Sequence, residues 1–288
     1  MRYRFLKPDD LPAVHATFAK AFADYFVEFT LSADQFQNHL SDNGVRLELS
    51  VGAFDGAEMV GLLLNGVDSW QGQLAAYDAG TGVIPSHRGR GIAGQMLRYA
   101  IPTLRAKGVG QCLLEVIREN EAAIRAYRKL GFTETRALEC VSLPANRVLP
   151  QAAHSSLRIR PIAQPDWTYL QTFWDWQPAW QNSVASIGRM RRQKMVLGAF
   201  DGHACLGYGV ILPESGRISQ LAVAKSQRGQ GIATQLLHAF REQAGPGSSL
   251  SMINIEGTAS DTLAFFAARG FERTISQFEM ALDVVRSA

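Results

Sequence analysis

The hydrophobic positions of the chain follow two periods, one typical of buried strands and one typical of amphipathic helices. Apolar runs at 47–54, 58–64 and 74–83 predict three consecutive strands, the first two joined by a hairpin turn at Asp55-Gly56. A helix is expected next, because every third or fourth residue is apolar; these residues are Ile92, Met96, Leu97, Ile101 and Leu104. Strands followed by a helix on this scale favour an α/β domain.

The hydrophobic pattern predicts two more strands and one more helix before a segment without any hydrophobic period. A mostly apolar run at 111–117 predicts a central strand, an amphipathic stretch at 120–130 a helix, and 134–142 a last strand. The stretch 144–156 then contains two prolines and small residues, and it has no hydrophobic period. Such a composition is typical of a linker, which we place at 146–156.

An internal repeat covers most of the chain. The pentapeptide GAFDG occurs at 52–56 and again at 198–202. The segment RGRGIA at 88–93 is matched by RGQGIA at 228–233. Repeated blocks in the same order indicate two copies of one supersecondary unit.

The repeat and the length together predict two domains. The 288 residues are enough for two, and 47% hydrophobic with 19% charged residues is typical of a globular protein. We therefore expect one domain at 1–145, a linker at 146–156 and a second domain at 157–288.

Composition excludes several classes of protein. A net charge of +3 from scattered Lys and Arg argues against nucleic acid as the main partner. No run approaches the roughly 18 apolar residues of a membrane span, and the N-terminus has no apolar signal region. Cys112, Cys140 and Cys205 are too far apart for a zinc site and odd in number. We expect no metal and a cytoplasmic location.

The first glycine-rich loop is the strongest chemical signal in the chain. Pro85 ends the preceding strand, and Gly89 and Gly91 allow the backbone to turn tightly before a helix begins at Ile92. The unpaired N–H groups of a helix start favour an anion. The sequence G-x-x-x-x-G-K-[ST] of nucleotide P-loops is absent, and so is a G-x-G-x-x-G dinucleotide motif after a first strand.

The loop resembles the [QR]-x-x-G-x-[GA] signature of the GNAT superfamily of acetyl-CoA-dependent N-acetyltransferases. Arg88, Gly91 and Ala93 occupy its three defining positions. The resemblance implies two tandem GNAT-like domains of α/β class, each a mixed, twisted sheet flanked by helices.

The same resemblance implies where acetyl-CoA binds. The backbone of 81–83 would pair with the pantetheine arm, and 89–94 would hold the pyrophosphate. Asn120 would either contact the pantetheine or simply cap its helix. The expected cofactor-binding residues of the first copy are Thr81, Gly82, Val83, Arg88, Gly89, Arg90, Gly91, Ile92, Ala93, Gly94 and Asn120.

Candidate catalytic groups follow from the reaction. An amine that attacks a thioester must lose a proton, and the departing sulfur must gain one. Glu115, on an interior strand, and Asp78 are rival bases, and Tyr127 is the candidate acid. The spacing from Glu115 through Asn120 to Tyr127 is similar to that of acetyltransferases acting on ribosomal-protein N-termini. We expect direct attack by the amine, because no cysteine occupies these pocket positions.

The second copy departs from this pattern. Asn254, Ala259 and Phe266 stand where the first copy has a carboxylate, an amide and a phenol. Its loop signature is complete, and the expected cofactor-binding residues there are Arg228, Gly229, Gly231 and Ala233. We expect this domain to be catalytically silent, and the sequence leaves open whether it binds CoA.

The sequence thus predicts an acetyl-CoA-dependent N-acetyltransferase that acetylates a primary amine. The acceptor is a small molecule or a peptide N-terminus. The alternative is a non-enzymatic CoA-binding or regulatory protein. The acceptor, the oligomeric state and the choice between Glu115 and Asp78 stay open.

Overall fold

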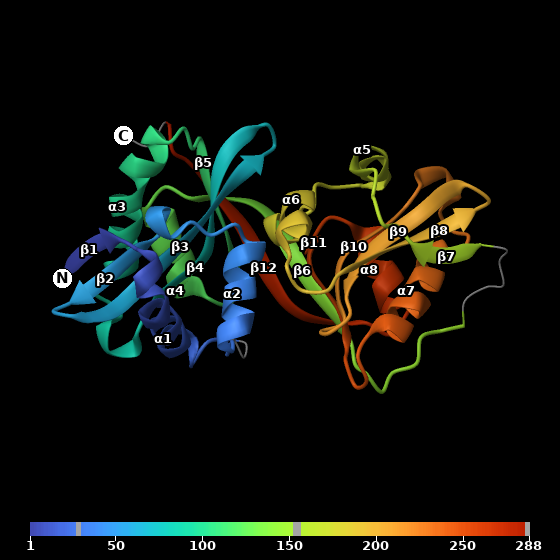
Figure 1. Cartoon of the computed structure of the whole chain (residues 1–288), viewed down its shortest axis with the longest axis horizontal. Helices are drawn as coiled ribbons and strands as arrows, with labels where there is room; N and C mark the ends of the chain where they lie inside the picture. The colour runs from blue at the N-terminus through green and yellow to red at the C-terminus, as the bar shows by residue number, and fades with distance from the viewer. Residues whose placement is uncertain (27–29, 152–156, 286–288) are drawn as a thin grey trace. The chain divides into compact units, whose positions relative to one another are not determined.

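The computed structural model describes residues 1–26, 30–151 and 157–285, which form two compact units (Figure 1). The first unit contains Met1–Arg136 together with Gln277–Ala288, and the second contains Ala137–Ser276. Residues 152–156 of the predicted linker lie outside the described residues, and 146–151 have no helix or strand. Within the described ranges, every helix is too short or too polar to cross a membrane.

The first unit is built on a mixed sheet. Its strands lie in the order β1 (Arg2–Phe5), β2 (Val51–Asp55), β3 (Glu58–Trp70), β4 (Gln73–Val83), β5 (Gln111–Ile117) and β12 (Glu272–Asp283, from Gln277 onward). Neighbouring strands are antiparallel except β4 and β5, which are parallel. The prediction of an α/β fold with a mixed sheet is confirmed.

Helices cover both faces of this sheet. They are α1 (Leu11–Phe22), α2 (Ala33–Asp42), α3 (Ile92–Ala106) and α4 (Glu121–Lys129). A Cβ added at Gly61 would meet Ile92 and Met96 of α3, whereas one added at Gly82 would meet Ala21 of α1. Gly82 pairs with Leu62, the neighbour of Gly61, and neighbouring strand residues face opposite sides. Helices α1 and α3 therefore lie on opposite faces.

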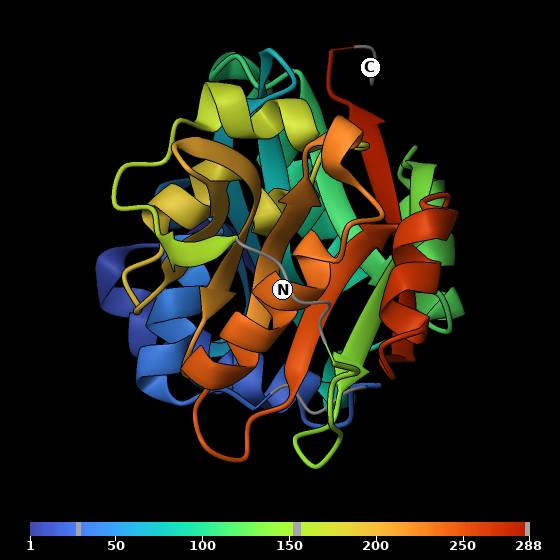
Figure 2. The same cartoon turned by 90° about the vertical axis from the view of Figure 1, so that its right-hand side faces the viewer.

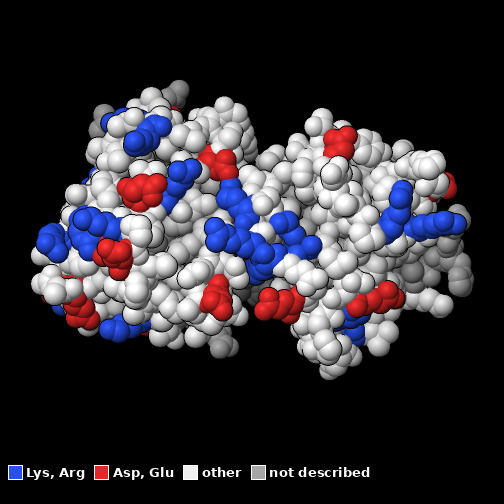
Figure 3. Space-filling model, viewed as in Figure 1, with Lys and Arg blue, Asp and Glu red and all other residues white. Residues whose placement is uncertain are grey.

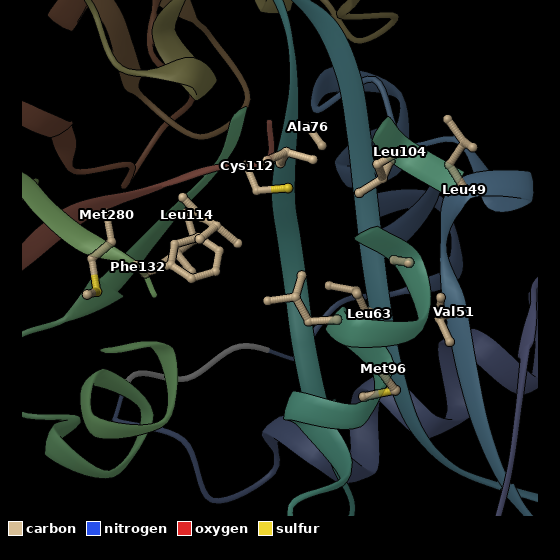
Figure 4. Close-up of a cluster of buried hydrophobic side chains, with 14 of the residues drawn as sticks. Leu49, Val51, Leu63, Ala76, Met96, Leu104, Cys112, Leu114, Phe132 and Met280 are labelled. Atoms are coloured by element: carbon tan, nitrogen blue, oxygen red, sulfur yellow. The ribbon is translucent and has the colours of Figure 1, made fainter. Parts of the chain in front are cut away.

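The last strand of the chain contributes to the core of the first unit. Met280 is fully buried beside Leu114 and Phe132, in the cluster that also holds Leu63 and Met96 (Figure 4). The strand pairs along β5 from Gln277 with Ile117 to Asp283 with Gln111.

The second unit repeats this architecture. Its strands lie in the order β6 (Thr133–Leu143, from Ala137 onward), β11 (Leu250–Glu256), β10 (Arg217–Val223), β9 (Ala204–Leu212), β8 (Met195–Asp201) and β7 (Arg158–Pro161). Its helices are α5 (Trp167–Leu170), α6 (Val184–Arg189), α7 (Ile232–Gln243) and α8 (Ser260–Ala267). Helix α7 packs against β8, β9 and β10 (Figure 2).

The two copies exchange their last strands. A division at 146–156 assigns β6 to the first copy and β12 to the second, but residues 138–143 pair with β11 and residues 277–283 pair with β5. The hydrophobic period identifies each segment as a strand but contains no information about which partner it pairs with. The spatial division therefore differs from the predicted one.

Two strand predictions differ from the structure in their bounds, and a proline lies inside a helix. Residues Leu47–Leu49 form a 3₁₀ turn rather than the start of a strand. The strand predicted at 58–64 continues to Trp70, where Gln71 and Gly72 turn with φ of 49° and 84°. Pro102 is exposed and leaves helix α3 continuous to Ala106.

Candidate active site

The first unit has a gap between its two parallel strands. Strands β4 and β5 pair only where Ala75–Tyr77 faces Gln111–Leu113. A bulge at Ala79 then shifts the register of β4 against β3. The edge of β4 that faces β5 is therefore free of strand pairing at 78–83, which contains the expected pantetheine contacts Thr81, Gly82 and Val83.

The glycine-rich loop follows directly and opens into helix α3. Gly89 and Gly91 have φ of 76° and 72°, which side chains other than glycine rarely adopt. A Cβ added at either position meets no atom within 4 Å, so the loop is open to a ligand. The helix begins at Ile92, and the first N–H groups of a helix have no partner within it. The loop therefore has the form of an anion cradle.

Arg88 is bound to the protein rather than free to face this cradle. Its Nη1 and Nη2 each donate to the Asp24 carboxylate at 2.6 Å, and Nη2 also donates to the Ala21 carbonyl at 3.0 Å. Its Nε donates to the Val83 carbonyl at 3.1 Å. Four of the five N–H groups of the Arg88 guanidinium thus donate to protein atoms, and Arg88 connects the loop to the end of helix α1. Sequence reasoning missed Asp24.

A hydrogen-bonded cluster surrounds Asp78 at the start of the gap. Its Oδ1 accepts from the Gly80 N–H at 3.0 Å, and its Oδ2 accepts from the Thr81 hydroxyl at 2.6 Å and from the Tyr127 hydroxyl at 3.2 Å. The side chain keeps some solvent access. Burial nevertheless raises the pKa of the Asp78 carboxyl to about 6, against the lowering effect of the three hydrogen bonds.

Tyr127 reaches this cluster from helix α4. Burial, and then the negative charge of Asp78, raise the pKa of the Tyr127 hydroxyl well above its usual value. The phenol therefore stays protonated at neutral pH and can act as a proton donor. Sequence reasoning placed both residues in the site, and the structure brings them into contact.

Glu115 and Asn120 have other partners. Glu115 Oε2 accepts from the Tyr77 hydroxyl at 2.7 Å. Asn120 caps helix α4 by accepting from the Ala123 N–H at 3.2 Å, and its side chain also hydrogen-bonds the Tyr25 hydroxyl. Tyr25 lies beyond the end of helix α1, and the sequence analysis did not name it as a site residue.

The second unit repeats the loop but lacks the titratable cluster. Gly229 and Gly231 have φ of 75° and 79°, and Ala233 lies in the first turn of α7. Arg228 pairs with Asp175 at 3.0 Å, as Arg88 does with Asp24. The residue that corresponds to Asp78 is Ile218, which is fully buried in the hydrophobic core.

Comparisons with known proteins agree on one family. Residues 14–132 match the model of the Acetyltransferase (GNAT) family, and residues 174–282 match that of the Acetyltransferase (GNAT) domain. Over 91 residues the chain is 37% identical to streptothricin acetyltransferase of Streptomyces lavendulae, which covers 32% of this chain and 46% of that protein. Over 92 residues it is 29% identical to N-alpha-acetyltransferase 30 of Schizosaccharomyces pombe. This match covers 32% of this chain and 61% of that protein. The chain thus matches less than two thirds of either relative.

A solved structure extends the likeness to both units. A tandem GNAT protein from the clavulanic acid biosynthesis pathway superposes with a TM-score of 0.72. The match covers 98% of this chain and 99% of that one at 16% identity, so it bears on the fold alone. Two family matches together span most of the chain, and each unit has a glycine loop and the same order of strands. These findings lead to one conclusion: the chain belongs to the GNAT acetyltransferase family.

Proposed function

We propose that the first unit transfers an acetyl group from acetyl-CoA to a primary amine, with Asp78 as the base and Tyr127 as the acid. The observation that carries this proposal is their direct hydrogen bond of 3.2 Å beside the gap between β4 and β5. It brings a carboxyl with a pKa of about 6 and a protonated phenol to one place.

The residues around the gap fit acetyl-CoA. The open loop at 89–94 offers backbone N–H groups to a pyrophosphate, and the unpaired edge at 81–83 offers peptide groups to the pantetheine amides. We assign Arg88 to holding this loop in shape through Asp24 rather than to direct contact with phosphate. Bound acetyl-CoA would supply the thioester whose acetyl group is transferred.

Asp78 has the properties of a general base for an amine. With a pKa of about 6 the carboxyl is largely ionised at pH 7.5, yet it is more basic than an ordinary aspartate. It can accept the proton that the amine nitrogen loses as the new amide bond forms. The N–H of Gly80 and the hydroxyl of Thr81 keep the carboxylate in one orientation.

Tyr127 completes the proton balance. The amine loses one proton to Asp78, and the departing sulfur gains one from the Tyr127 hydroxyl. The hydrogen bond between the two side chains then lets Asp78 return its proton to the phenolate, so that both groups regain their starting states. Loss of such a general acid typically costs about 10²–10⁴-fold in rate.

This assignment selects Asp78 over Glu115 as the base. Glu115 accepts a hydrogen bond from the hydroxyl of Tyr77, whereas the hydroxyl of Tyr127 donates to Asp78. We assign Glu115 a structural role in β5.

The acceptor is proposed to be a small amine or a peptide N-terminus. Streptothricin acetyltransferase is named for a small-molecule acceptor, and N-alpha-acetyltransferase 30 for α-amino groups. Both acidic and basic side chains are visible in Figure 3, and the net charge of the chain is only +3, which does not favour nucleic acid. All three cysteines are free and buried, which fits the reducing conditions of the cytoplasm.

The test is thiol release from acetyl-CoA with a panel of amines, including aminoglycosides, diamines and short peptides with free N-termini. Asp78→Asn and Tyr127→Phe should each lower turnover by about 100-fold or more, while Glu115→Gln should retain most of it. Binding of acetyl-CoA without thiol release for any amine would instead favour a non-enzymatic CoA-binding protein. Loss of turnover in Glu115→Gln alone would transfer the role of base to Glu115.

A further inference from the structure

The second unit contains a cavity of about 370 Å³ between its glycine loop and its helix α8. Arg228 and Gly231 lie at one end of its lining, and Ser219 of β10 and Asn254 of β11 lie in its polar part. Between them the wall is apolar and includes Trp176 and other aromatic side chains. Two aspartates also line the cavity: Asp175, which pairs with Arg228, and Asp261 of α8. A ligand there would meet an anion cradle, a hydrophobic wall and a polar surface.

No proton donor or acceptor for acyl transfer faces this cavity at the positions used in the first unit. Ile218 is fully buried in the core where Asp78 would stand, and Phe266, 1% exposed, replaces the phenol of Tyr127. Asn254 has φ of 60° and an amide that does not titrate near neutral pH. A thioester bound in this cavity would therefore lack the counterparts of the base and the acid that we assign in the first unit.

The aromatic wall is held in a fixed position. Trp174 Nε1 donates to the Tyr208 hydroxyl at 2.6 Å, which in turn donates to Gln220 Oε1 at 2.7 Å. Gln220 Nε2 donates to the Asn182 carbonyl at 2.6 Å. Because these polar groups bind one another, the indole of Trp174 presents mainly its ring to the cavity.

One buried hydroxyl in the cavity wall has no such partner. Ser219 is 0% exposed, and its Oγ makes no hydrogen bond to any described residue. It lies at the bulge of β10, where the first unit has Ala79. An unpaired buried hydroxyl destabilises a folded protein, so its presence in a cavity wall indicates a ligand with a polar group such as a carbonyl.

We propose that the second unit binds, without reaction, a CoA thioester whose acyl group is larger and more apolar than acetyl. The inference rests on the proposed function in one respect, the assignment of the glycine loops as CoA sites. The loop at 228–233 would take the pyrophosphate, and Ser219 would donate to a carbonyl of the ligand. The acyl group would lie against Trp174 and Trp176. The bound thioester would stabilise this unit by mass action.

The experiment is calorimetric titration of the full chain carrying Gly91→Asp, which disables the loop of the first unit. The probes are hexanoyl-CoA, acetyl-CoA and CoA. We expect hexanoyl-CoA to bind at least about tenfold more tightly than acetyl-CoA, because more apolar surface is buried. Addition of Gly231→Asp should abolish this binding. Equal or weaker binding of hexanoyl-CoA would overturn the proposal, as would thiol release from hexanoyl-CoA by the Gly91→Asp chain.

A second variant tests the role of Ser219. Ser219→Ala removes the hydroxyl and leaves the residue type that the first unit has at this bulge. We expect the affinity for hexanoyl-CoA to fall by about fivefold, while the melting temperature of the free protein stays the same or rises. Unchanged affinity would show that Ser219 contacts no ligand. Acetylation of amines by the unchanged chain is a separate measurement, so failure of the proposed function and failure of this inference are distinguishable.

Discussion

Replacing the proposed base should make the protein inactive and more stable at the same time. Asp78→Asn keeps the size of the side chain and an oxygen that can accept from the Gly80 N–H. Its amide can donate to the hydroxyl oxygens of Thr81 and Tyr127, which now donate to the carboxylate. What the change removes is a buried negative charge.

The magnitude follows from the pKa. Burial raises the pKa of Asp78 from an ordinary value of 3.8 to about 6. Between these values the folded protein binds a proton that the unfolded chain has released, so the free energy of unfolding falls as the pH rises. Above about pH 7 the decrease in the free energy of unfolding is nearly complete and amounts to about 3 kcal/mol, at about 1.4 kcal/mol per pH unit. At pH 5 only about 1.6 kcal/mol has been lost.

The assay is urea unfolding of the full chain, monitored by circular dichroism at pH 8 and at pH 5. The variant should exceed the wild type in free energy of unfolding by up to about 3 kcal/mol at pH 8 and by about half of that at pH 5. Asp201→Asn, at an exposed hairpin position of the second unit, is the control and should change the free energy of unfolding by less than about 0.5 kcal/mol. The reasoning would be refuted by a variant that is less stable than the wild type at pH 8, or by a difference that is the same at both pH values.

Three further outcomes are expected. Gly91→Asp should weaken binding of acetyl-CoA to the first unit by about tenfold or more in calorimetry and abolish turnover, whereas Gly231→Asp should lower turnover much less; the opposite order would place the chemistry in the second unit. Tyr127→Phe should lower kcat with little change in acetyl-CoA affinity, and a kcat within about threefold of the wild type would make Tyr127 a packing residue. Met280→Ala, at a fully buried position, should cost about 2–5 kcal/mol in unfolding of the first unit, while Val285→Ala, at a position 70% exposed, should cost almost nothing; similar costs would deny β12 a place in that core.

The elements of this fold could be predicted because each leaves a local mark on the sequence. The helix at Ile92–Ala106 has apolar residues at helical spacing, and the loop before it is rich in glycine. The repeated GAFDG marks the same hairpin in both copies. The exchange of β6 and β12 could not be predicted. Both segments have similar apolar content and follow similar helices, so a choice of partner strand is made by packing over long distances in sequence.

The identity of the main site residues could be predicted from the sequence, but their arrangement in space could not. Asp78 and Tyr127 were named from the reaction and the family motif, but their separation of 3.2 Å depends on the bulge at Ala79 and the position of helix α4. Asp24 could not be recognised from the sequence, because an exposed carboxylate beyond the end of a helix does not differ there from any other surface carboxylate. The role that we propose for Ser219 could not be predicted from the sequence either, because it depends on the lack of a hydrogen-bond partner for its hydroxyl in the folded chain.

The position of β12 has a consequence for how the protein is made. The strand that completes the sheet of the first unit leaves the ribosome after the strands of the second unit, although the rest of the first unit emerges before them. By contrast, β6, which belongs to the second unit, is synthesised before the other strands of that unit. During translation the nascent first unit therefore exposes the edge of β5 and the apolar side chains that Met280 later covers. The domain that we propose to be catalytic is thus finished last, and premature termination after the second unit would leave it without its sixth strand.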